Sequence, residues 1–552
     1  MTSSSPGNTA LNAERRARDL AELAETEASG AEPFDLVVIG GGITGTGVAL
    51  DAASRGLSVV LVERGDLASG TSGWSSKLAH GGLRYLAKLD VPIAWESAVE
   101  RGHLMRRIAP HLIRPVKMLF PLHTHVSHFD AALTGTGFFA GDVLRMLART
   151  PKSLLPHPHR ISPGEVCRLA PATASSGLRG GLLSWDGQIV DDARLVVTMA
   201  RTAAAHGARI ITYATATGVE SGVESRVESG RVQVTDRLTG KPHTIRAKQI
   251  INAAGVWADS LSEDVELAPS KGSHLLVRAE SMGNPTAAVT APVPGHFGRF
   301  VFAVPWDDGL VMIGLTDDPH TGQIPERARP DAEERTFLLD TINAVLENPL
   351  TPEDVVGSFA GFRPLLKGKA DSGADLSRKH ALLRDSATNL LTIVGGKLTA
   401  YRRMAEDAVD AAVEAGGLTA RPCRTTTLSL VGAGTPRAGL PSHLVRRYGT
   451  DAEAVASYSA DDPALSEPVR AGIPLSRAEI RFAVEHELAV TVEDVIDRRT
   501  RWGLVDADRA DLAAAVRKHA PELLETSEPT ETGQNARLAQ PTRPIRTTQD
   551  EG

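Results

Sequence analysis

A glycine-rich turn near the N-terminus is the first feature of the sequence whose residue types and spacing could bind a ligand. Gly40, Gly42 and Gly45 fit the pattern GxGxxG directly after the apolar run 36–39. In this pattern the first glycine permits a tight turn, the second lets the backbone approach a pyrophosphate, and the third lets a helix lie close to the strand. Free N–H groups at the start of that helix would bind the pyrophosphate. The spacing predicts a dinucleotide site.

An acidic residue stands where such a site needs one. Gly56 ends the expected helix, residues 57–62 form the next strand, and Glu63 closes it. A carboxylate at this position holds ribose hydroxyls. Because the strand, the helix, the second strand and the acid are all present, a dinucleotide site is favoured over a glycine-rich turn without a ligand.

The segments that follow favour FAD over a nicotinamide. Residues 65–86 are rich in Gly, Ser and Thr and suit wrapping the flavin end of an extended cofactor. The backbone is also expected to approach the cofactor closely at the strand end 251–255 and at a glycine turn more than 350 residues after the first. A nicotinamide enzyme would not need this last turn. The expected cofactor contacts beyond the first turn are Glu63, Thr71, Ser72, Ser75, Ser76, Lys77, His80, Gly81, Ala254, Gly255, Gly395 and Gly396.

The elements that must position these residues are strand–turn–helix units. Segments 35–56, 249–261 and 389–412 each begin with an apolar run, turn on glycine and continue into an Ala-rich helical pattern. Buried parallel strands have this character, so we expect one sheet assembled from separated segments. At 299–316, two apolar runs flank Asp307-Asp308-Gly309, a hairpin signal that predicts an antiparallel sheet in a second domain.

These patterns predict an α/β protein with four regions. Residues 1–32 read as a flexible N-terminal tail. Residues 33–425 read as a dinucleotide-binding domain interleaved with a substrate domain, whose sheet covers about 266–354. Residues 426–525 read as a C-terminal helical domain, and 526–552 as a disordered tail.

Composition excludes several classes of protein. The net charge is −7, with 42% apolar and 23% charged residues, as in a soluble globular protein with no general attraction to nucleic acid. The two cysteines, Cys167 and Cys423, lie far apart without metal-ligand spacing, so neither a metal site nor a disulfide scaffold is expected. No signal peptide and no run of 18 apolar residues is present. We expect a cytoplasmic protein, with peripheral contact at the inner face of the cell membrane left open.

Several motifs together resemble the FAD-dependent glycerol-3-phosphate dehydrogenase family of the aerobic type. They run in family order from about residue 34 to residue 505: SSKLAHGGLRYL (75–86), NAAGVWAD (252–259), KGSHLLV (271–277), AGFRPL (360–365), GGKLTAYRRMAE (395–406) and DRRTRWGL (497–504). The resemblance implies a Rossmann-like FAD-binding domain, an antiparallel-sheet substrate domain and a C-terminal helical cap. It implies oxidation of sn-glycerol 3-phosphate to dihydroxyacetone phosphate by hydride transfer to FAD, with a membrane quinone as electron acceptor.

The resemblance also implies a substrate pocket. A phosphate dianion needs guanidinium or ammonium partners, and the family pattern places Arg84, Tyr85 and Arg363 there. Lys397, with Thr399 beside it, is expected to bind the substrate or to stabilise the reduced flavin. His274 is the candidate base because an imidazole titrates near working pH, and His80 is the alternative. For each of these side chains an ordinary ion pair or structural hydrogen bond stays open.

Other functions remain open at this stage. They are a glycerol-3-phosphate oxidase that uses oxygen, an amine or amino-acid oxidase on the same fold, and a flavoprotein without catalysis. The family's oxidases carry a mid-chain insertion that this sequence lacks, which favours the quinone acceptor. The oligomeric state is undetermined, a homodimer included. Four C-terminal residues could form a basic and aromatic membrane anchor, although cations at a helix C-terminus are the favoured interpretation: Arg498, Arg499, Arg501 and Trp502.

Overall fold

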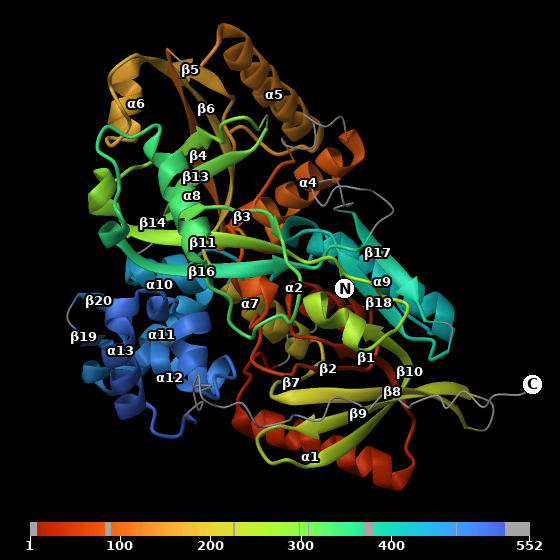
Figure 1. The fold of residues 1–552 in the computed structure, drawn as a ribbon. Helices are drawn as coiled ribbons and strands as arrows, with labels where there is room; N and C mark the ends of the chain where they lie inside the picture. Colours follow the sequence, from red (N-terminus) through yellow and green to blue (C-terminus); the bar gives the residue numbers. More distant parts are fainter. Residues whose placement is uncertain are drawn as a thin grey trace, which may run out of the picture.

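Two sheets and a helical C-terminal domain make up the molecule (Figure 1). The computed structural model describes residues 8–82, 90–124, 126–224, 227–296, 298–306, 309–367, 379–385, 387–470 and 472–524.

The first sheet contains the parallel strands that the sequence predicts, with β17 antiparallel at its edge. Its strand order is β17 (His380–Arg384), β18 (Leu391–Gly395), β10 (Pro242–Asn252), β1 (Phe34–Ile39), β2 (Val59–Val62) and β7 (Arg209–Ile211). β1 lies parallel to both β10 and β2, and β10 lies parallel to β18. The three separated glycine-turn segments therefore meet in one sheet, as predicted.

Both faces of this sheet are covered, which explains its almost continuous apolar strands. Side chains alternate between faces. One face packs against α2 (Ile43–Ser54), α7 (Asp192–Ala205) and α9 (Tyr401–Gly416). The other packs against α1 (Ala13–Ser29) and against the strand pair β8 (Ala214–Glu224) and β9 (Val227–Asp236), which belongs to the same sheet because β9 pairs antiparallel with β10. After β10 the chain forms only a short 3₁₀ helix, η3 (Gly255–Ser260), and not the expected Ala-rich helix. The Asn252 side chain bonds to backbone at Ala254 and Ala258, which competes with helix formation.

Helix α1 corrects the expectation of a flexible tail over residues 1–32, because residues 8–32 are packed. The Asn12 side chain caps the helix, Leu20 and Leu23 enter the core, and the Arg16 guanidinium lies 2.5 Å from an Asp236 carboxylate oxygen. Charged residues surround the narrow apolar stripe, and its partners lie some 200 residues away in β7 and β10. Local composition therefore did not reveal it.

The second sheet is larger than expected. Its order is β15 (Asp318–Pro319), β11 (Ser270–Arg278), β14 (Leu310–Gly314), β13 (Phe300–Trp306), β12 (Ala288–Pro292), β4 (Ile113–His123), β6 (Leu178–Ile189) and β3 (Leu78–Ala79). In addition, β16 (Val355–Arg363) pairs with β11, and β5 (His159–Ile161) pairs with β6. The predicted hairpin is confirmed, with Trp306 opposite Leu310. Asp307 and Asp308 lie outside the described residues.

The expected range 266–354 therefore misses strands on both sides. β3, β4, β5 and β6 precede it and β16 follows it. Their pairing partners are distant in sequence, so no local signal assigns them to this sheet. The helices around the sheet are α4 (Val91–His103), α5 (His128–Leu147), α6 (Pro163–Leu169) and α8 (Ala332–Asn343). Within the described part of the chain, no helix is both long enough and apolar enough to span a bilayer.

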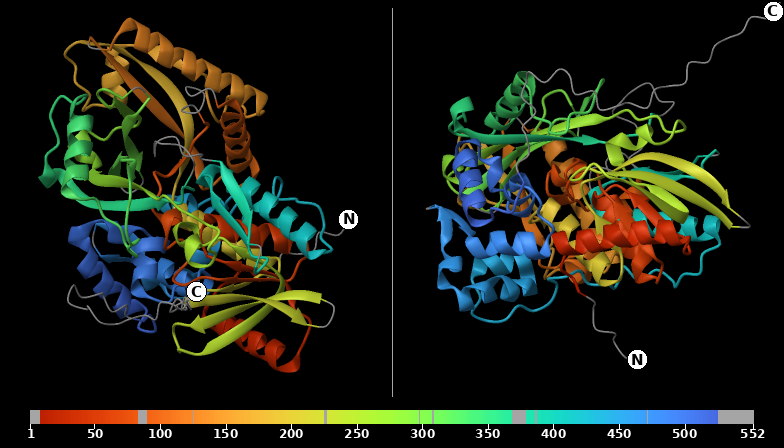
Figure 2. Two further views of the ribbon diagram at one scale, coloured as in Figure 1. Left: turned by 45° about the vertical axis from the view of Figure 1, so that its right-hand side comes forward. Right: turned by 90° about the horizontal axis from the view of Figure 1, so that it is seen from below.

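The C-terminal region is helical, as expected. It contains α10 (Ser442–Tyr448), α11 (Ala452–Asp461), α12 (Arg477–His486) and α13 (Asp506–His519), the π-helical turn η11 (Asp494–Arg499), the 3₁₀ turn η12 (Trp502–Leu504), and the small hairpin β19 (Pro468–Arg470) with β20 (Ile473–Ser476). Figure 2 shows these helices beside β11 and β16 of the second sheet. The remaining short helices are η1 (Thr71–Gly73), η2 (Leu104–Ile108), η4 (Ala279–Met282), η6 (Pro352–Asp354), η8 (Leu398–Ala400), η9 (Gly449–Asp451) and η10 (Pro463–Ser466). The expected tail 526–552 lies outside the described residues.

Candidate active site

The carboxyl ends of β1, β2, β10 and β18 meet at one edge of the first sheet, where the glycine turn lies. Gly40 has a φ of +114°, in the region that favours glycine. A Cβ atom at Gly45 would collide with the carbonyl oxygen of Gly40, so only glycine lets α2 begin this close to β1. Gly42 caps the N-terminus of α2. The turn has the backbone geometry of a dinucleotide site.

Glu63 is fixed at the end of β2 by backbone donors. Its carboxylate accepts hydrogen bonds from the N–H groups of Gly41 at 2.5 Å and Gly65 at 2.7 Å. Burial raises the pKa of Glu63, which these two hydrogen bonds oppose. A carboxylate has about four lone-pair sites, so two stay available for ribose hydroxyls. A Cβ at Gly41 would lie 2.8 Å from the Glu63 side chain, so Gly41, which sequence reasoning did not single out, belongs to the site.

The segment around η1 connects the glycine turn to the second sheet. The Ser72 hydroxyl accepts a hydrogen bond from the Ile43 N–H at 2.8 Å, at the start of α2. The neighbouring Thr71 hydroxyl donates to the Phe362 carbonyl at 2.6 Å, at the end of β16. These contacts place the Gly- and Ser-rich stretch between the two sheets, where a flavin-wrapping segment is expected.

The two later glycine turns lie at the same sheet edge. Ala254 and Gly255 follow β10, and Gly395 and Gly396 follow β18. A Cβ at Gly396 would lie 2.5 Å from the Met404 sulfur, so this turn packs directly on α9. The structure thus brings together the four strand ends that the sequence analysis assigned to the cofactor.

His274 lies on β11 and faces the η1 segment. Its Nε2 is 2.9 Å from the Ser76 hydroxyl, and its ring stacks on Phe359 with centroids 4.7 Å apart. Burial, followed by the charges of Lys77 and Arg363, lowers the pKa of His274 to about 3. The expectation that this imidazole titrates near working pH is therefore wrong, and the ring is neutral at pH 7. Its buried Nδ1 has no hydrogen-bond partner among the described residues.

Beside His274 lies a buried network of charges. The Lys77 ammonium lies 3.3 Å from an Asp192 oxygen and over the rings of Trp306 and Phe359. Asp192 also accepts hydrogen bonds from the Ser75 N–H at 2.8 Å and the Ser75 hydroxyl at 2.7 Å. Burial lowers the pKa of Lys77 to about 8, although Asp192 opposes the shift. Asp192 is thus the anchor of the segment that carries Ser75 and Lys77.

The third charge in this network comes from the C-terminal domain. Arg501 donates to Asp192, to the Gly73 carbonyl and, at 3.1 Å, to Asp191. Two neighbouring arginines also form buried ion pairs, since Arg498 and Arg499 both pair with Asp66. Arg499 is 0% exposed. Arg498 and Arg499 lie in the last turn of η11, so the favoured assignment to a helix C-terminus is confirmed for these two cations. The alternative of a membrane anchor is wrong, because Arg499, Arg501 and Trp502 are buried and the arginines join the C-terminal domain to the cofactor domain.

His80, the alternative base, belongs to a different cluster. Its Nδ1 lies 3.2 Å from an Asp186 oxygen, and Asp186 also binds the Gly81 N–H at 3.0 Å and the Arg101 guanidinium at 2.5 Å. Burial raises the pKa of Asp186, but Arg101 and His80 outweigh it and bring the pKa to about 2. Asp186 and Arg101, which sequence reasoning missed, therefore fix the backbone at Gly81.

Arg363 lies at the end of β16, directly after the residue that Thr71 contacts. It donates to the Asp317 carboxylate at 2.9 Å, the Ser270 hydroxyl at 3.2 Å and the Thr316 carbonyl at 3.4 Å. The guanidinium is thus held in one orientation. The two other residues assigned to the substrate pocket beside it, Arg84 and Tyr85, lie outside the described residues.

Lys397 and Thr399 lie in the turn that joins β18 to α9. Lys397 is the cap residue of η8, and its ammonium donates to the Ser97 hydroxyl of α4. Thr399 is buried. Both follow Gly395 and Gly396, so they share the sheet edge with the glycine turn, as the sequence predicted.

Comparison with known proteins establishes the class. A family model described as FAD dependent oxidoreductase matches residues 35–402, and a model of the C-terminal domain of alpha-glycerophosphate oxidase matches residues 386–527. Together they span the two sheets and the helical C-terminal domain. The chain is an FAD-dependent oxidoreductase with this additional C-terminal domain, and the four strand ends fit the cofactor.

The relatives narrow the class further. Glycerol-3-phosphate dehydrogenase 1 of Mycobacterium tuberculosis is 49% identical over 93% of this chain and 99% of its own. The crystal structure of the Bacillus halodurans glycerol-3-phosphate dehydrogenase complexed with FAD has a TM-score of 0.70, with 29% identity over 94% of this chain and 95% of its own. L-alpha-glycerophosphate oxidase of Mycoplasma pneumoniae shares the fold, with a TM-score of 0.53 and 20% identity over 72% of this chain and 99% of its own. The chain belongs to the FAD-dependent glycerol-3-phosphate dehydrogenase family.

Proposed function

We propose that the protein oxidises sn-glycerol 3-phosphate to dihydroxyacetone phosphate and passes the electrons to a membrane quinone. One observation carries the substrate assignment: a pre-oriented guanidinium, Arg363, lies beside a buried neutral imidazole, His274, next to the segment that borders the dinucleotide edge. A guanidinium binds phosphate, and an imidazole accepts the proton of an alcohol. The relation to glycerol-3-phosphate dehydrogenase 1 supports the same substrate.

In this proposal, some residues of the site bind the substrate and others transfer a proton. FAD, when bound, supplies the acceptor for the carbinol hydride. The Arg363 guanidinium binds the phosphate while Asp317 holds its orientation, and Arg84 and Tyr85 are proposed to complete the pocket. Lys397 and Thr399 bind the glycerol end or stabilise the reduced cofactor.

The low pKa of His274 is consistent with this division. After burial, the cations Lys77 and Arg363 depress it. A phosphate dianion on Arg363 would counter those charges and raise the pKa, because an opposite charge nearby favours the protonated imidazole. His274 would thus gain basicity only when the phosphorylated substrate is present.

The test is anaerobic flavin reduction. Purified protein with bound FAD is mixed with glycerol 3-phosphate, glycerol or an amine, and the visible flavin absorbance is followed. We expect bleaching with glycerol 3-phosphate and little with the other two. Bleaching by the amine alone would favour an amine oxidase, and no bleaching with any of the three would refute the catalytic proposal.

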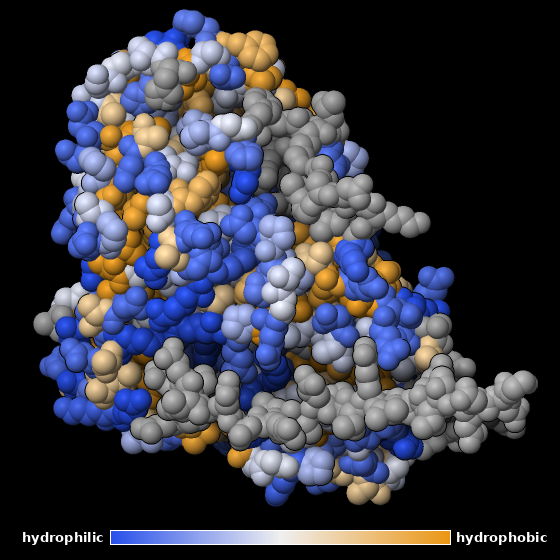
Figure 3. Space-filling view, in the orientation of Figure 1, coloured by the Kyte–Doolittle hydropathy of each residue, from blue (hydrophilic) through white to orange (hydrophobic). Residues whose placement is uncertain are grey.

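An exposed apolar surface supports the membrane quinone as acceptor. Large apolar side chains of α4 and α5 are exposed, with Phe129 at 74% and Phe139 at 67%. The full set is Val91, Trp95, Phe129, Leu133, Phe139, Met146 and Leu147. At about 100° per residue, the α5 positions fall on one side of that helix. In Figure 3 the apolar patches gather mainly in the upper half, the part that contains α5 and the second sheet in Figure 1. Such a face suits the interfacial region of a bilayer.

The acceptor and the membrane contact are tested separately. Reduced enzyme is offered a soluble quinone analogue or oxygen, and we expect the quinone to reoxidise the flavin much faster. Faster reoxidation by oxygen would favour the oxidase alternative. For membrane contact, Phe129→Ser with Phe139→Ser should reduce co-sedimentation with anionic lipid vesicles. The matched control is Leu238→Ser, an exposed apolar residue outside α4 and α5. Equal binding by both variants would refute this surface.

A further inference from the structure

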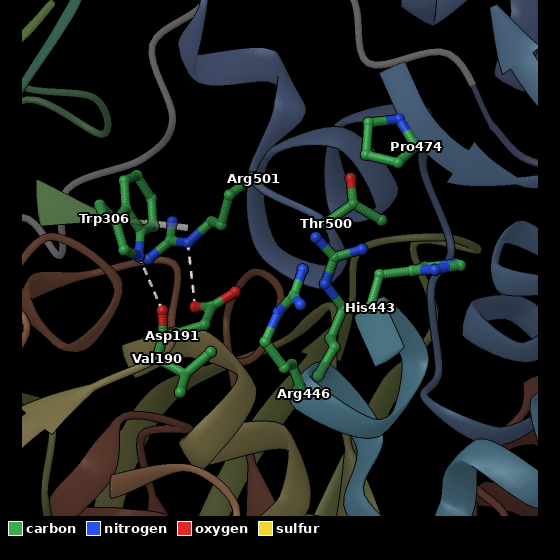
Figure 4. A pocket seen from close by; sticks show the side chains of 9 residues that line it. Val190, Asp191, Trp306, His443, Arg446, Pro474, Thr500 and Arg501 are labelled. Atoms are coloured by element: carbon green, nitrogen blue, oxygen red, sulfur yellow. Dashed lines mark hydrogen bonds and ion pairs between the residues drawn. The ribbon is translucent and has the colours of Figure 1, made fainter. Parts of the chain in front are cut away.

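A small pocket opens where the C-terminal domain meets the second sheet (Figure 4). Its volume is about 30 Å³. The polar and aromatic lining consists of Asp191, Trp306, His443, Arg446, Arg447, Thr500 and Arg501. In Figure 4 the α10 side chains stand on one side of the pocket and the Arg501–Asp191 pair on the other. Nothing in the proposed reaction uses this pocket.

The walls of the pocket are rigid. Trp306 donates from its indole N–H to the Val190 carbonyl at 2.8 Å, and Thr500 donates to the Val495 carbonyl at 2.8 Å. Asp191 and Arg501 are both about 5% exposed and are paired with each other at 3.1 Å. The pocket is therefore part of the packed domain junction.

Positive charge in the pocket exceeds negative charge. Three guanidinium groups and one imidazole line it, against the single carboxylate of Asp191. Arg501 is neutralised by Asp191 and Asp192, and Arg447 pairs with Glu479 at 2.7 Å. The side chains of Arg446 and His443 make no hydrogen bond or ion pair within the described residues. Arg114 adds a further cation at the end of α10, where it donates to the Arg446 carbonyl at 2.6 Å. The cluster is unusual in a chain of net charge −7.

We propose that this pocket is a second anion site that binds a compact phosphate group at the junction of the two domains. The volume exceeds the 10–15 Å³ or so that one water needs. A guanidinium fork and an imidazole, which come from one helix and face a third cation, suit the several oxygens of a phosphate. The dianion would neutralise the excess positive charge of Arg446 and accept a hydrogen bond from the His443 imidazole. The source of the phosphate group is either inorganic phosphate or a small phosphomonoester whose remainder projects to solvent past the exposed Arg446.

The experiment is calorimetric titration of the FAD-loaded protein with inorganic phosphate, at an ionic strength held constant with chloride. Arg446→Gln and His443→Gln should each weaken this binding about tenfold or more, because each removes one charge-assisted hydrogen bond. Neither side chain contacts the cofactor edge, so the flavin spectrum and FAD content should not change. Arg447 is left intact, since its loss would strand the buried Glu479.

Arg437→Gln is the matched control, because Arg437 is an exposed arginine of the same domain outside the pocket lining. It should bind phosphate like the wild type. The proposal is overturned if wild type shows no phosphate binding, or if Arg446→Gln and His443→Gln bind like the control, which would place any phosphate only at the substrate pocket. A parallel titration with glycerol 2-phosphate separates the sources. Binding that depends on Arg446 shows that the site accepts phosphomonoesters. Failure to bind, with inorganic phosphate still bound, restricts the site to the free ion.

Discussion

The two ends of the candidate active site are built by different means. At the edge of the first sheet, glycine geometry and one carboxylate form the nucleotide end, and Glu63 is held by N–H groups only two and 22 residues away. At the second sheet, the substrate end relies on buried charges from distant segments. Asp192 there lies 115 residues from Lys77 and 309 from Arg501.

The two ends differ in how well they tolerate the loss of a single side chain. A backbone donor stays in place whenever its turn forms, so the nucleotide end depends on few side chains. A buried charge is costly unless its partner is present, so the substrate end depends on every member of its network. The comparison therefore predicts that single substitutions at the two ends have different consequences.

The largest expected effect is at Asp192. Asp192→Ala leaves the buried charges of Lys77 and Arg501 without their partner, and we expect a loss of about 3–5 kcal/mol in the free energy of unfolding. Urea unfolding of the FAD-loaded protein measures it. The control is Glu453→Ala, which breaks the exposed pair with Arg437 and should cost less than about 1 kcal/mol. Equal losses in the two variants would contradict the role of the network.

Arg363 comes next. Removing one partner of a desolvated ion pair costs about 2–5 kcal/mol, so Arg363→Ala should lower kcat/KM for glycerol 3-phosphate by about 30-fold to several thousand-fold. Arg84→Ala should act in the same way. Arg363→Lys should restore only part of the loss, because lysine lacks the planar fork. Glycerol, which has no phosphate, is the internal control and should lose little further. Turnover of glycerol 3-phosphate within about threefold of wild type, with FAD retained, would refute the phosphate role.

A smaller effect is expected at the nucleotide end. Glu63→Ala removes charge-assisted hydrogen bonds to the ribose, each worth about 1.5–3 kcal/mol, which corresponds to about 10- to 150-fold in FAD affinity. Fluorescence titration of the protein stripped of FAD measures the affinity. The fold should survive, because the flanking strands do not depend on Glu63, although the N–H groups of Gly41 and Gly65 lose their acceptor. An unchanged FAD affinity would show that Glu63 does not bind the ribose.

The last prediction is the pH dependence of stability from His274, which changes stability without changing any contact at neutral pH. Its pKa is about 3 in the folded protein and about 6.5 in the unfolded chain. Between these values the unfolded state binds more protons, so stability decreases as pH falls below about 6.5. The slope from this one group reaches about 1.4 kcal/mol per pH unit. Urea midpoints at pH 7 and pH 4.5 should therefore fall more in wild type than in His274→Gln. An equal fall in both proteins would show that His274 does not contribute.

The sequence alone determined the nucleotide end. The glycine spacing, the strand before it and Glu63 after it all act through local backbone geometry, so their arrangement follows from residues close together in the chain. The three parallel strands could also be predicted, because strands buried on both faces must be apolar throughout. The motifs spread over the chain were sufficient to identify the family.

Only the tertiary structure decided the rest, because it concerns partners distant in sequence. Composition described residues 8–32 as a tail, whereas Leu20 and Leu23 join a core that includes strands about 200 residues away. The sequence predicted that His274 is a base that titrates near working pH, but burial and two neighbouring cations lower its pKa to about 3. In the sequence, Arg501 is one of several cations at the end of a predicted helix, and only the tertiary structure shows that it pairs with Asp192. Burial and electrostatic interactions depend on which segments are in contact, and those contacts are determined by the whole tertiary fold.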